Sequence, residues 1–293
     1  MKVTGLTLQE NIHVSSKREN VINALECPQD STVAILGPCS ATFNTEMTIL
    51  ENQLIQEFEE EHRNSGLIAL QRLPFWKPRT NPDDWHGIES THPEEATQFI
   101  EALNRFGSNV AGETGLPRHV GRLSGAQVFS WIGSRNFGNI ELTEQLMRHE
   151  IDIPIGIKND TKGDVKGLLE FTKFVNMRNT RNAPPTVPIF RGGSLLNTPD
   201  KWGEAVKEIS FKTRGRCIID LAHGSEMVHD PDKNKSEEGQ INAVIHLGKL
   251  LQAGNVVAGF MIETSDIQSP TDPVISFNRG LRCARLLLQA KKR

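Results

Sequence analysis

The stretch Ile153–Phe190 reads IPIGIKNDTKGDVKGLLEFTKFVNMRNTRNAPPTVPIF. It begins with the continuous apolar run Ile153–Ile157 and ends with a second run, Pro188–Phe190. Between these runs, Val165–Met177 has apolar residues at the spacing of one helix face. Continuous apolar runs are typical of parallel strands that are covered on both faces. The stretch therefore predicts a strand, a helix and a second parallel strand.

The same alternation extends in both directions along the chain. Eight apolar runs are expected to form strands: Thr32–Gly37, Leu67–Leu73, Asn109–Gly112, Val128–Gly133, Ile153–Ile157, Pro188–Phe190, Cys217–Leu221 and Val256–Ile262. The expected helices are Glu46–Glu61, Pro93–Phe106, the weaker Pro117–Gln127, Glu141–Arg148, Val165–Met177, Lys201–Lys212, Gly239–Leu251 and Pro273–Ala290. Eight strand–helix units in about 260 residues predict an α/β fold of the (β/α)8 TIM barrel type. A doubly wound open sheet is the alternative, although it rarely needs eight units in one domain.

No linker, low-complexity stretch or charge block divides the 293 residues. We expect a short N-terminal extension at residues 1–31, with a helix around Ser16–Leu25, followed by a catalytic barrel domain at residues 32–293.

Composition excludes several classes of protein. The 33 Lys and Arg against 36 Asp and Glu leave a net charge of -3, which argues against a nucleic-acid partner. No apolar run is long enough to span a membrane. The four cysteines are scattered without a Cys-x-x-Cys pair, so we expect reduced thiols and a cytoplasmic location.

In a barrel of this type the chemistry lies at the C-terminal ends of the strands. Reactive or charged residues follow every expected strand. In chain order they are Cys39, Arg72 with Lys77 and Arg79, Glu113, Ser134 with Arg135, Lys158, Arg191, Asp220 with His223, and Glu263, with Asp272 one loop later.

Four of these residues suit a divalent transition metal: Cys39, His223, Glu263 and Asp272. Taken singly, Cys39 could be a small buried hydrophobe, His223 a hydrogen-bonded core residue, and Asp272 a helix-start acid. Their convergence at one barrel mouth favours the ligand interpretation.

Six other residues are cations: Arg72, Lys77, Arg79, Arg135, Lys158 and Arg191. A cluster of this kind typically binds phosphate or carboxylate, which Arg can hold through two parallel hydrogen bonds. The residues therefore predict a metal beside two anionic, phosphorylated ligands.

Five motifs in this order give the chain a family resemblance: Gly37-Pro-Cys-Ser40, Lys77-Pro-Arg-Thr80, Gly156-Ile-Lys-Asn159, Arg191-Gly-Gly193 and Ile219-Asp-Leu-Ala-His223. From about Thr32 to its C-terminus, the chain resembles the class I 3-deoxy-D-arabino-heptulosonate 7-phosphate (DAHP) synthases. The resemblance implies a TIM-barrel transferase that condenses phosphoenolpyruvate with erythrose 4-phosphate and releases phosphate, the first step of the shikimate pathway of aromatic amino acid biosynthesis.

The resemblance also implies roles for individual residues. The metal ligands would be Cys39, His223, Glu263 and Asp272, with Mn²⁺ the first expectation and Fe²⁺, Co²⁺ or Zn²⁺ the alternatives. Phosphoenolpyruvate would be bound by Arg72, Lys158, Arg191, Arg135 and the Ser134 backbone. Erythrose 4-phosphate would be bound by Lys77, Arg79 and Thr80, with help from Asp272. Glu113 would order a water, and Glu113 or Lys158 would serve in proton transfer, so that the catalytic set is Lys158, Glu113, His223 and Cys39.

The chain departs from the family pattern at several places. Asp266 competes with Asp272 as the fourth ligand, and Trp85-His86-Gly87 stands where relatives have Trp-Lys-Gly. His86 is either a surface imidazole or part of the aldehyde pocket. The stretch from Lys158 to Arg191 lacks the extra hairpin with which feedback-inhibited relatives bind aromatic amino acids, so we expect no such inhibition.

Three functions follow from these patterns. The first is DAHP synthase activity, in a homo-oligomer that is a dimer or a tetramer. The second is the same phosphoenolpyruvate chemistry on another aldose phosphate or aldehyde in specialised metabolism, which the loop departures favour. The third is a non-catalytic ligand-binding relative. The presence of every implied metal ligand and cation argues against this function.

Overall fold

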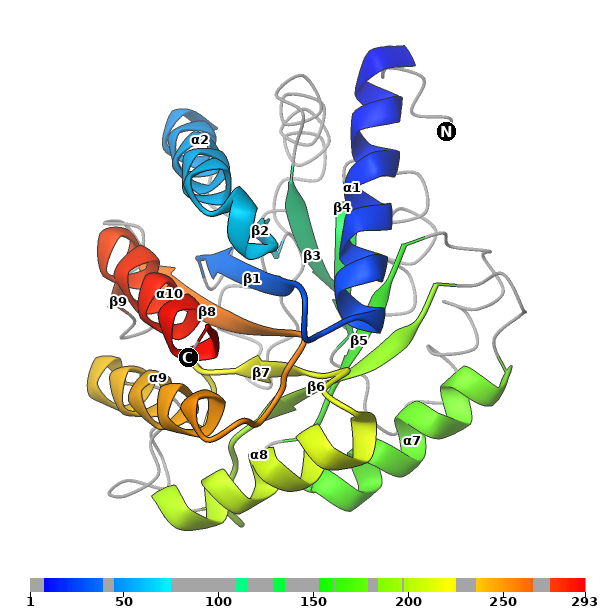
Figure 1. Ribbon diagram of the computed structural model, residues 1–293, viewed down its shortest axis with the longest axis vertical. Helices are drawn as coiled ribbons and strands as arrows, with labels where there is room; N and C mark the ends of the chain where they lie inside the picture. The colour runs from blue at the N-terminus through cyan, green and yellow to red at the C-terminus, as the bar shows by residue number, and fades with distance from the viewer. Residues whose placement is uncertain are drawn as a thin grey trace, which may run out of the picture.

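A computed structural model describes residues 8–38, 45–74, 109–114, 129–134, 153–160, 162–178, 184–196, 198–224, 236–265 and 275–292. Each strand from β1 to β8 pairs in parallel with the next, and β1 also pairs with β8, so that the sheet closes on itself (Figure 1). This closure confirms the predicted (β/α)8 barrel and excludes the open sheet.

The barrel strands lie close to the expected apolar runs. Their bounds are β1 Thr32–Gly37, β2 Leu67–Arg72, β3 Val110–Thr114, β4 Phe129–Ser134, β5 Ile155–Lys158, β6 Thr186–Arg191, β7 Ile218–Asp220 and β8 Gly259–Ser265. A short additional strand, β9 (Ile275–Ser276), pairs with the end of β8.

The described helices cover the outside of the barrel or lie at its N-terminal end (Figure 1). They are α1 Leu8–Glu26, α2 Thr45–Glu61, the 3-10 turn η1 Arg63–Ser65, α7 Val165–Arg178, α8 Pro199–Thr213, α9 Glu237–Gln252 and α10 Phe277–Lys291. None of the described helices is long and apolar enough to cross a membrane. The expected helices Pro93–Phe106, Pro117–Gln127 and Glu141–Arg148 lie outside the described residues.

Two predicted helix bounds were wrong. The N-terminal helix begins at Leu8 rather than near Ser16, and the last helix begins at Phe277 rather than Pro273. The last helix starts later because Ile275 and Ser276 pair with Thr264 and Ser265 of β8.

Two apolar clusters lie on the two faces of the sheet, one outside the barrel and one inside it. The outer cluster joins the strands to the covering helices and includes Trp202, Phe190 and Leu247. The inner cluster fills the barrel, and Val21, Ala24 and Leu25 of α1 belong to it. Because α1 also donates a hydrogen bond from Arg18 Nε to the carbonyl oxygen of Phe129, at the start of β4, this helix covers the N-terminal end of the barrel.

The side-chain amine of Lys291, in the C-terminal helix α10, binds residues around the start of β1. Lys291 Nζ donates to the carbonyl oxygens of Pro28 and Ser31, both at 2.6 Å, and to Thr32 Oγ1 at 2.7 Å. The contact therefore joins residues about 260 positions apart in the chain.

We expect Lys291→Met to lower the free energy of unfolding by about 2–3 kcal/mol. The substitution removes the donor that the two carbonyl oxygens and the Thr32 hydroxyl share. Urea unfolding followed by circular dichroism measures the loss. Lys292→Met is the matched control, since the side chain of Lys292 is exposed. Equal losses in the two variants would show that the contact contributes nothing specific.

Candidate active site

The described polar residues of the predicted site are buried at the C-terminal ends of adjacent strands. Parallel register places Gly37 beside Glu263, Arg72 beside Ala111, and Arg191 beside Asp220. The buried members of this group are Arg72, Glu113, Ser134, Lys158, Arg191, Asp220, His223 and Glu263. The structure thus places seven residues for which the sequence analysis predicted a role at this end of the barrel, together with Asp220.

Arg72 is held between two carboxylates. Its Nη2 atom lies 2.5 Å from Glu113 Oε2 and 2.9 Å from Glu263 Oε1, and its Nη1 atom donates to the carbonyl oxygen of Pro38. Only 2% of the Arg72 side chain is exposed. The guanidinium therefore holds both carboxylates at the end of β2.

His223 is oriented by Asp220, which lies at the end of β7. Asp220 Oδ2 lies 2.9 Å from His223 Nδ1, and Asp220 Oδ1 accepts from the backbone N–H groups of Ala222 and His223. When the Nδ1 proton is donated to this carboxylate, the lone pair of the neutral imidazole is on Nε2. That nitrogen faces Glu263 Oε1 across 3.3 Å.

A nitrogen lone pair and a carboxylate oxygen that face each other repel, and a cation bound between them removes this repulsion. His223 Nε2 and the Glu263 carboxylate are therefore a donor pair that fits a divalent metal, and Asp220 supplies the usual carboxylate support behind the histidine. Among the described residues, no group of three or more His, Cys, Asp or Glu side chains is placed to hold a metal. Of the four predicted ligands, Cys39 and Asp272 lie outside the described residues.

Lys158 completes a buried charged cluster with Asp220 and His223. Its Nζ atom pairs with Asp220 Oδ2 and lies 3.1 Å from His223 Nδ1. Burial alone would raise the pKa of Asp220, but the positive charges of Lys158 and Arg191 and the backbone N–H of His223 hold that pKa below its usual value. Asp220 therefore stays ionised beside Lys158.

Two side-chain amides fix the backbone at this end of the barrel. Asn159 accepts from the Arg191 N–H at 2.7 Å and donates to the Arg191 carbonyl at 3.1 Å. Gln240 of α9 makes the same two-way contact with Glu263, at 3.1 and 2.8 Å. Each amide thus positions a residue of the site through its main chain, a role that the sequence analysis missed for both amides.

The sequence analysis also missed the role of Asp220, which it noted only as a strand-end residue. The Ile219-Asp-Leu-Ala-His223 spacing carried the signal, because an aspartate three residues before a histidine in a tight turn can reach the ring. The predicted substrate residues Lys77, Arg79, Thr80 and Arg135 lie outside the described residues, as do Asp266 and His86.

The turns after β6 and β7 touch through two glycines. A Cβ atom on Gly224 would lie 2.2 Å from the carbonyl oxygen of Gly192, and a Cβ on Gly192 would lie 2.1 Å from that of Gly224. Arg191 and His223 directly precede these glycines. The absence of side chains therefore lets the two turns approach closely enough to hold both residues at one site.

We expect Gly224→Ala to lower kcat/KM by about 100-fold, because separating the turns misplaces Arg191 and His223. Steady-state kinetics measures the effect. Gly254→Ala is the matched control: its φ of 85° resembles the 64° of Gly224, yet nothing lies within 4 Å of the added Cβ. Activity in Gly224→Ala as high as in Gly254→Ala would show that the close contact of the two turns does not position the site.

Comparisons with known proteins agree on one family. The family model described as the DAHP synthetase I family matches residues 12–271. A curated relative, the Trp-sensitive phospho-2-dehydro-3-deoxyheptonate aldolase of Buchnera aphidicola subsp. Acyrthosiphon pisum (strain APS), is 24% identical over 298 aligned residues, which cover 89% of this chain and 82% of the relative. The solved phospho-2-dehydro-3-deoxyheptonate aldolase of Francisella tularensis SCHU S4 superimposes with a TM-score of 0.75 at 19% identity, over 98% of this chain and 93% of that one.

Proposed function

The chain belongs to the DAHP synthetase I family, and we propose that it condenses phosphoenolpyruvate with erythrose 4-phosphate, in a metal-dependent reaction that gives DAHP and inorganic phosphate. One observation carries the proposal beyond family membership. The His223–Glu263 donor pair lies within one buried cluster that also contains Arg72 and Lys158. Side chains that suit a metal and cations that suit an anion thus lie at the same end of the barrel, which supports this reaction.

The cations suit the phosphoenolpyruvate end of the reaction. We assign Arg72, Lys158 and Arg191 to this substrate, with Arg135 and the Ser134 backbone at its phosphate. The first three side chains are buried, and because Arg72 and Lys158 are already paired with carboxylates, they suit an anion as hydrogen-bond donors held in position and not as unbalanced charges. Arg191 is fixed by Asn159 and Lys158 by Asp220, which keeps the donors in position before the substrate arrives.

The metal set proposed is Cys39, His223, Glu263 and Asp272, with Mn²⁺ preferred over Fe²⁺, Co²⁺ and Zn²⁺. When bound, the metal supplies a Lewis acid for the aldehyde oxygen of the second substrate. Asp220 keeps His223 Nε2 available by holding the ring proton on Nδ1, and Gln240 fixes the backbone of Glu263. These residues form the site before the metal enters.

We assign the orientation of water and the transfer of protons to Glu113 and Lys158. Glu113 is an acceptor beside Arg72, and Lys158 is a charged donor beside Asp220. A carboxylate orients a water molecule by accepting a hydrogen bond from it, whereas an ammonium group can donate a proton to the atom that it faces. We therefore assign the water that adds to phosphoenolpyruvate to Glu113, and proton donation to Lys158.

The aldehyde end of the site is assigned to Lys77, Arg79 and Thr80, with Asp272. The sequence Trp85-His86-Gly87 favours a second candidate, condensation with another aldose phosphate or aldehyde. Mass spectrometry of the products formed from phosphoenolpyruvate with erythrose 4-phosphate, arabinose 5-phosphate or ribose 5-phosphate decides between them. We expect DAHP as the main product; a larger yield from a five-carbon aldehyde would favour the second candidate, and phosphoenolpyruvate binding without any product would favour a non-catalytic relative.

We also propose that the enzyme is not inhibited by aromatic amino acids, although the Buchnera relative is named as Trp-sensitive. Between β5 and β6 the described residues form α7 and no strand. The expected result is full activity at 1 mM Phe, Tyr or Trp, roughly a thousand times a micromolar binding constant and so enough to saturate a tight site. A micromolar inhibition midpoint with any of the three would overturn the proposal.

The family resemblance further leads us to propose a homo-oligomer, either a dimer or a tetramer. Sedimentation equilibrium on the purified chain measures the state, and a monomer at micromolar concentration would contradict it.

A further inference from the structure

A groove of about 780 Å³ lies on the outside of the barrel between α7 and α8, which are neighbours there (Figure 1). Val165 at the start of α7 lines one end of the groove, together with Leu195 and Leu196, which precede α8. The backbone N–H of Leu195 donates to the carbonyl oxygen of Lys162, so these segments are held side by side. Phe211, near the end of α8, lines the other end of the groove. The groove therefore extends along most of α8, whose 15 residues span about 22 Å.

Both ends of the groove present apolar side chains to solvent. Phe211 is 81% exposed and Leu195 is 60% exposed. Phe211 is the most exposed of the six large hydrophobic side chains that the described part of the chain leaves at its surface. An apolar patch of this kind with charged residues around it typically marks a protein–protein contact.

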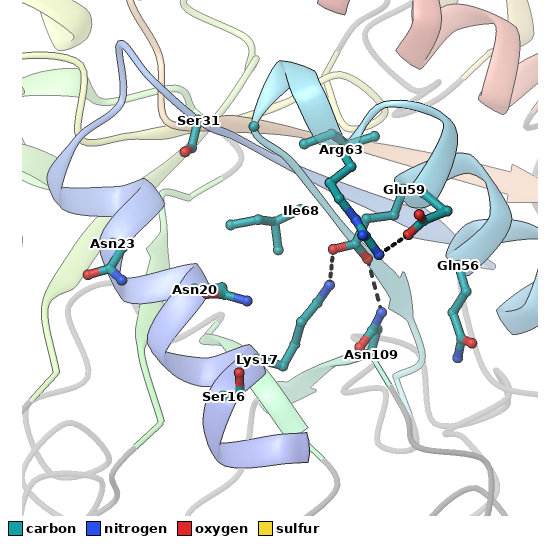
Figure 2. Close-up of a pocket in the computed structure, with 13 residues that line it drawn as sticks. Ser16, Lys17, Asn20, Asn23, Ser31, Gln56, Glu59, Arg63, Ile68 and Asn109 are labelled. Carbon is teal, nitrogen blue, oxygen red and sulfur yellow. Dashed lines mark hydrogen bonds and ion pairs between the residues drawn. The ribbon is translucent and has the colours of Figure 1, made fainter. Parts of the chain in front are cut away.

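The pocket between α1 and the end of α2 has a different character (Figure 2). Its charged side chains are paired with one another, Lys17 with Glu59 and Arg63 with Glu60. Exposed apolar side chains of the size of Phe211 are absent from its described lining. The groove along α8 is therefore the better candidate for a contact with another protein.

A two-fold axis can place this groove against the same groove of a second copy. The axis lies along the surface, perpendicular to α8, and passes between Gly203 and Glu204, so that the two α8 helices pack antiparallel. Such an axis keeps each groove over the other and exchanges their ends. Phe211 and Leu196 lie equally far in sequence from this midpoint. Phe211 of each copy therefore enters the Leu195–Leu196 end of the groove in the other copy.

The same axis brings opposite charges together. Asp200 and Lys207 also lie equally far from the midpoint, and both are exposed on the stripe of α8 that ends at Phe211. Asp200 of each copy thus lies opposite the partner subunit's Lys207, and the pair occurs twice. Within one chain these residues are about 10 Å apart along the helix, and Lys207 pairs with Glu204 at 2.7 Å. Because Glu204 is paired in this way, the two copies do not meet as bare like charges near the axis.

We propose that the groove is the interface of a two-fold dimer, in which each Phe211 fills the Leu195–Leu196 end of the partner subunit's groove. A buried Phe side chain contributes about 150–250 Å² of contact, and the symmetry supplies it twice. A different partner protein would not require a protruding side chain and its receiving end to be exchanged by one axis together with opposite charges. The inference rests on the homo-oligomer proposed above, whose contact surface it names, and it is independent of the proposed reaction.

Sedimentation equilibrium on the full chain measures the dissociation constant of the assembly. Phe211→Asp puts a charge into the groove from an exposed position, so the fold is preserved. We expect it to raise the dissociation constant by at least about 100-fold, because each dimer loses two central aromatic contacts. Leu286→Asp is the matched control, since Leu286 is also an exposed hydrophobic residue of a surface helix and lies outside the groove. It should associate like the wild type.

A charge exchange tests the two-fold arrangement itself. Asp200→Lys alone and Lys207→Asp alone each place like charges opposite one another across the interface, and each should raise the dissociation constant by about tenfold. The variant that carries both substitutions restores opposite charges and should return to within about threefold of the wild-type value. Because the two residues are far apart within one chain, this recovery reports a contact between copies.

Three outcomes would contradict the inference. Wild-type association of Phe211→Asp would place the interface on another surface and overturn this inference alone. A monomeric wild type at micromolar concentration would overturn both the inference and the proposed homo-oligomer. A doubly substituted chain that associates as weakly as the two single variants would overturn the two-fold arrangement.

Discussion

Lys158→Met is expected to lower kcat/KM by about 1,000-fold or more, because it removes a proton donor and a buried positive charge that attracts the substrate anion. The Nζ atom of Lys158 contacts both the Asp220 carboxylate and His223 Nδ1. Steady-state phosphate release measures the loss. The exposed Lys166→Met variant is the control and should retain wild-type activity.

Loss of activity in this variant could also reflect unfolding, because an unpaired Asp220 costs about 3–5 kcal/mol when its buried partner is removed. A second variant, Lys158→Met with Asp220→Asn, removes both charges. We expect it to recover most of the stability in urea unfolding while its activity stays at the level of the single variant. Recovery of turnover together with stability would show that Lys158 has only a structural role.

The second large effect is expected for metal binding in Glu263→Gln. Glu113 and Glu263 are both bound to Arg72, but only Glu263 faces His223 Nε2. We expect Glu263→Gln to weaken Mn²⁺ binding by more than about 100-fold, since loss of even an outer partner of a ligand typically costs 10–100-fold. Titration followed by electron paramagnetic resonance measures free Mn²⁺ directly and needs no turnover.

Glu113→Gln is the matched control because it makes the same change of charge on the other side of Arg72. It should bind Mn²⁺ with wild-type affinity and yet lose activity through poor handling of the attacking water. Equal loss of metal affinity in both variants would mean that Glu263 acts only through Arg72 and is no ligand.

The fold could be predicted from the sequence because a barrel strand covered on both faces leaves a continuous apolar run. The bounds of β1 coincide with the expected run Thr32–Gly37, and most other strands differ by one to three residues. The start of α1 could not be predicted in the same way. Residues 8–15 carry a weak apolar pattern, and the packing of Val21, Ala24 and Leu25 under the barrel is a tertiary effect.

The site was predictable only in part for a related reason. Residues at strand ends can be read along the chain, which predicted that Arg72, Lys158, His223 and Glu263 lie at one end of the barrel. The supporting contacts of Asn159 and Gln240 join different elements, and Gln240 lies 23 residues from Glu263. Such pairs depend on which helix covers which strand, and a single sequence does not show that arrangement.

The most direct test of the central claim is phosphate release from phosphoenolpyruvate and erythrose 4-phosphate, measured on chelator-stripped protein with and without added Mn²⁺. The account predicts turnover that requires both the aldehyde and the metal, with one phosphate released for each DAHP formed. Metal-independent phosphate release, or no release with erythrose 4-phosphate at saturating Mn²⁺ while phosphoenolpyruvate binds, would contradict it.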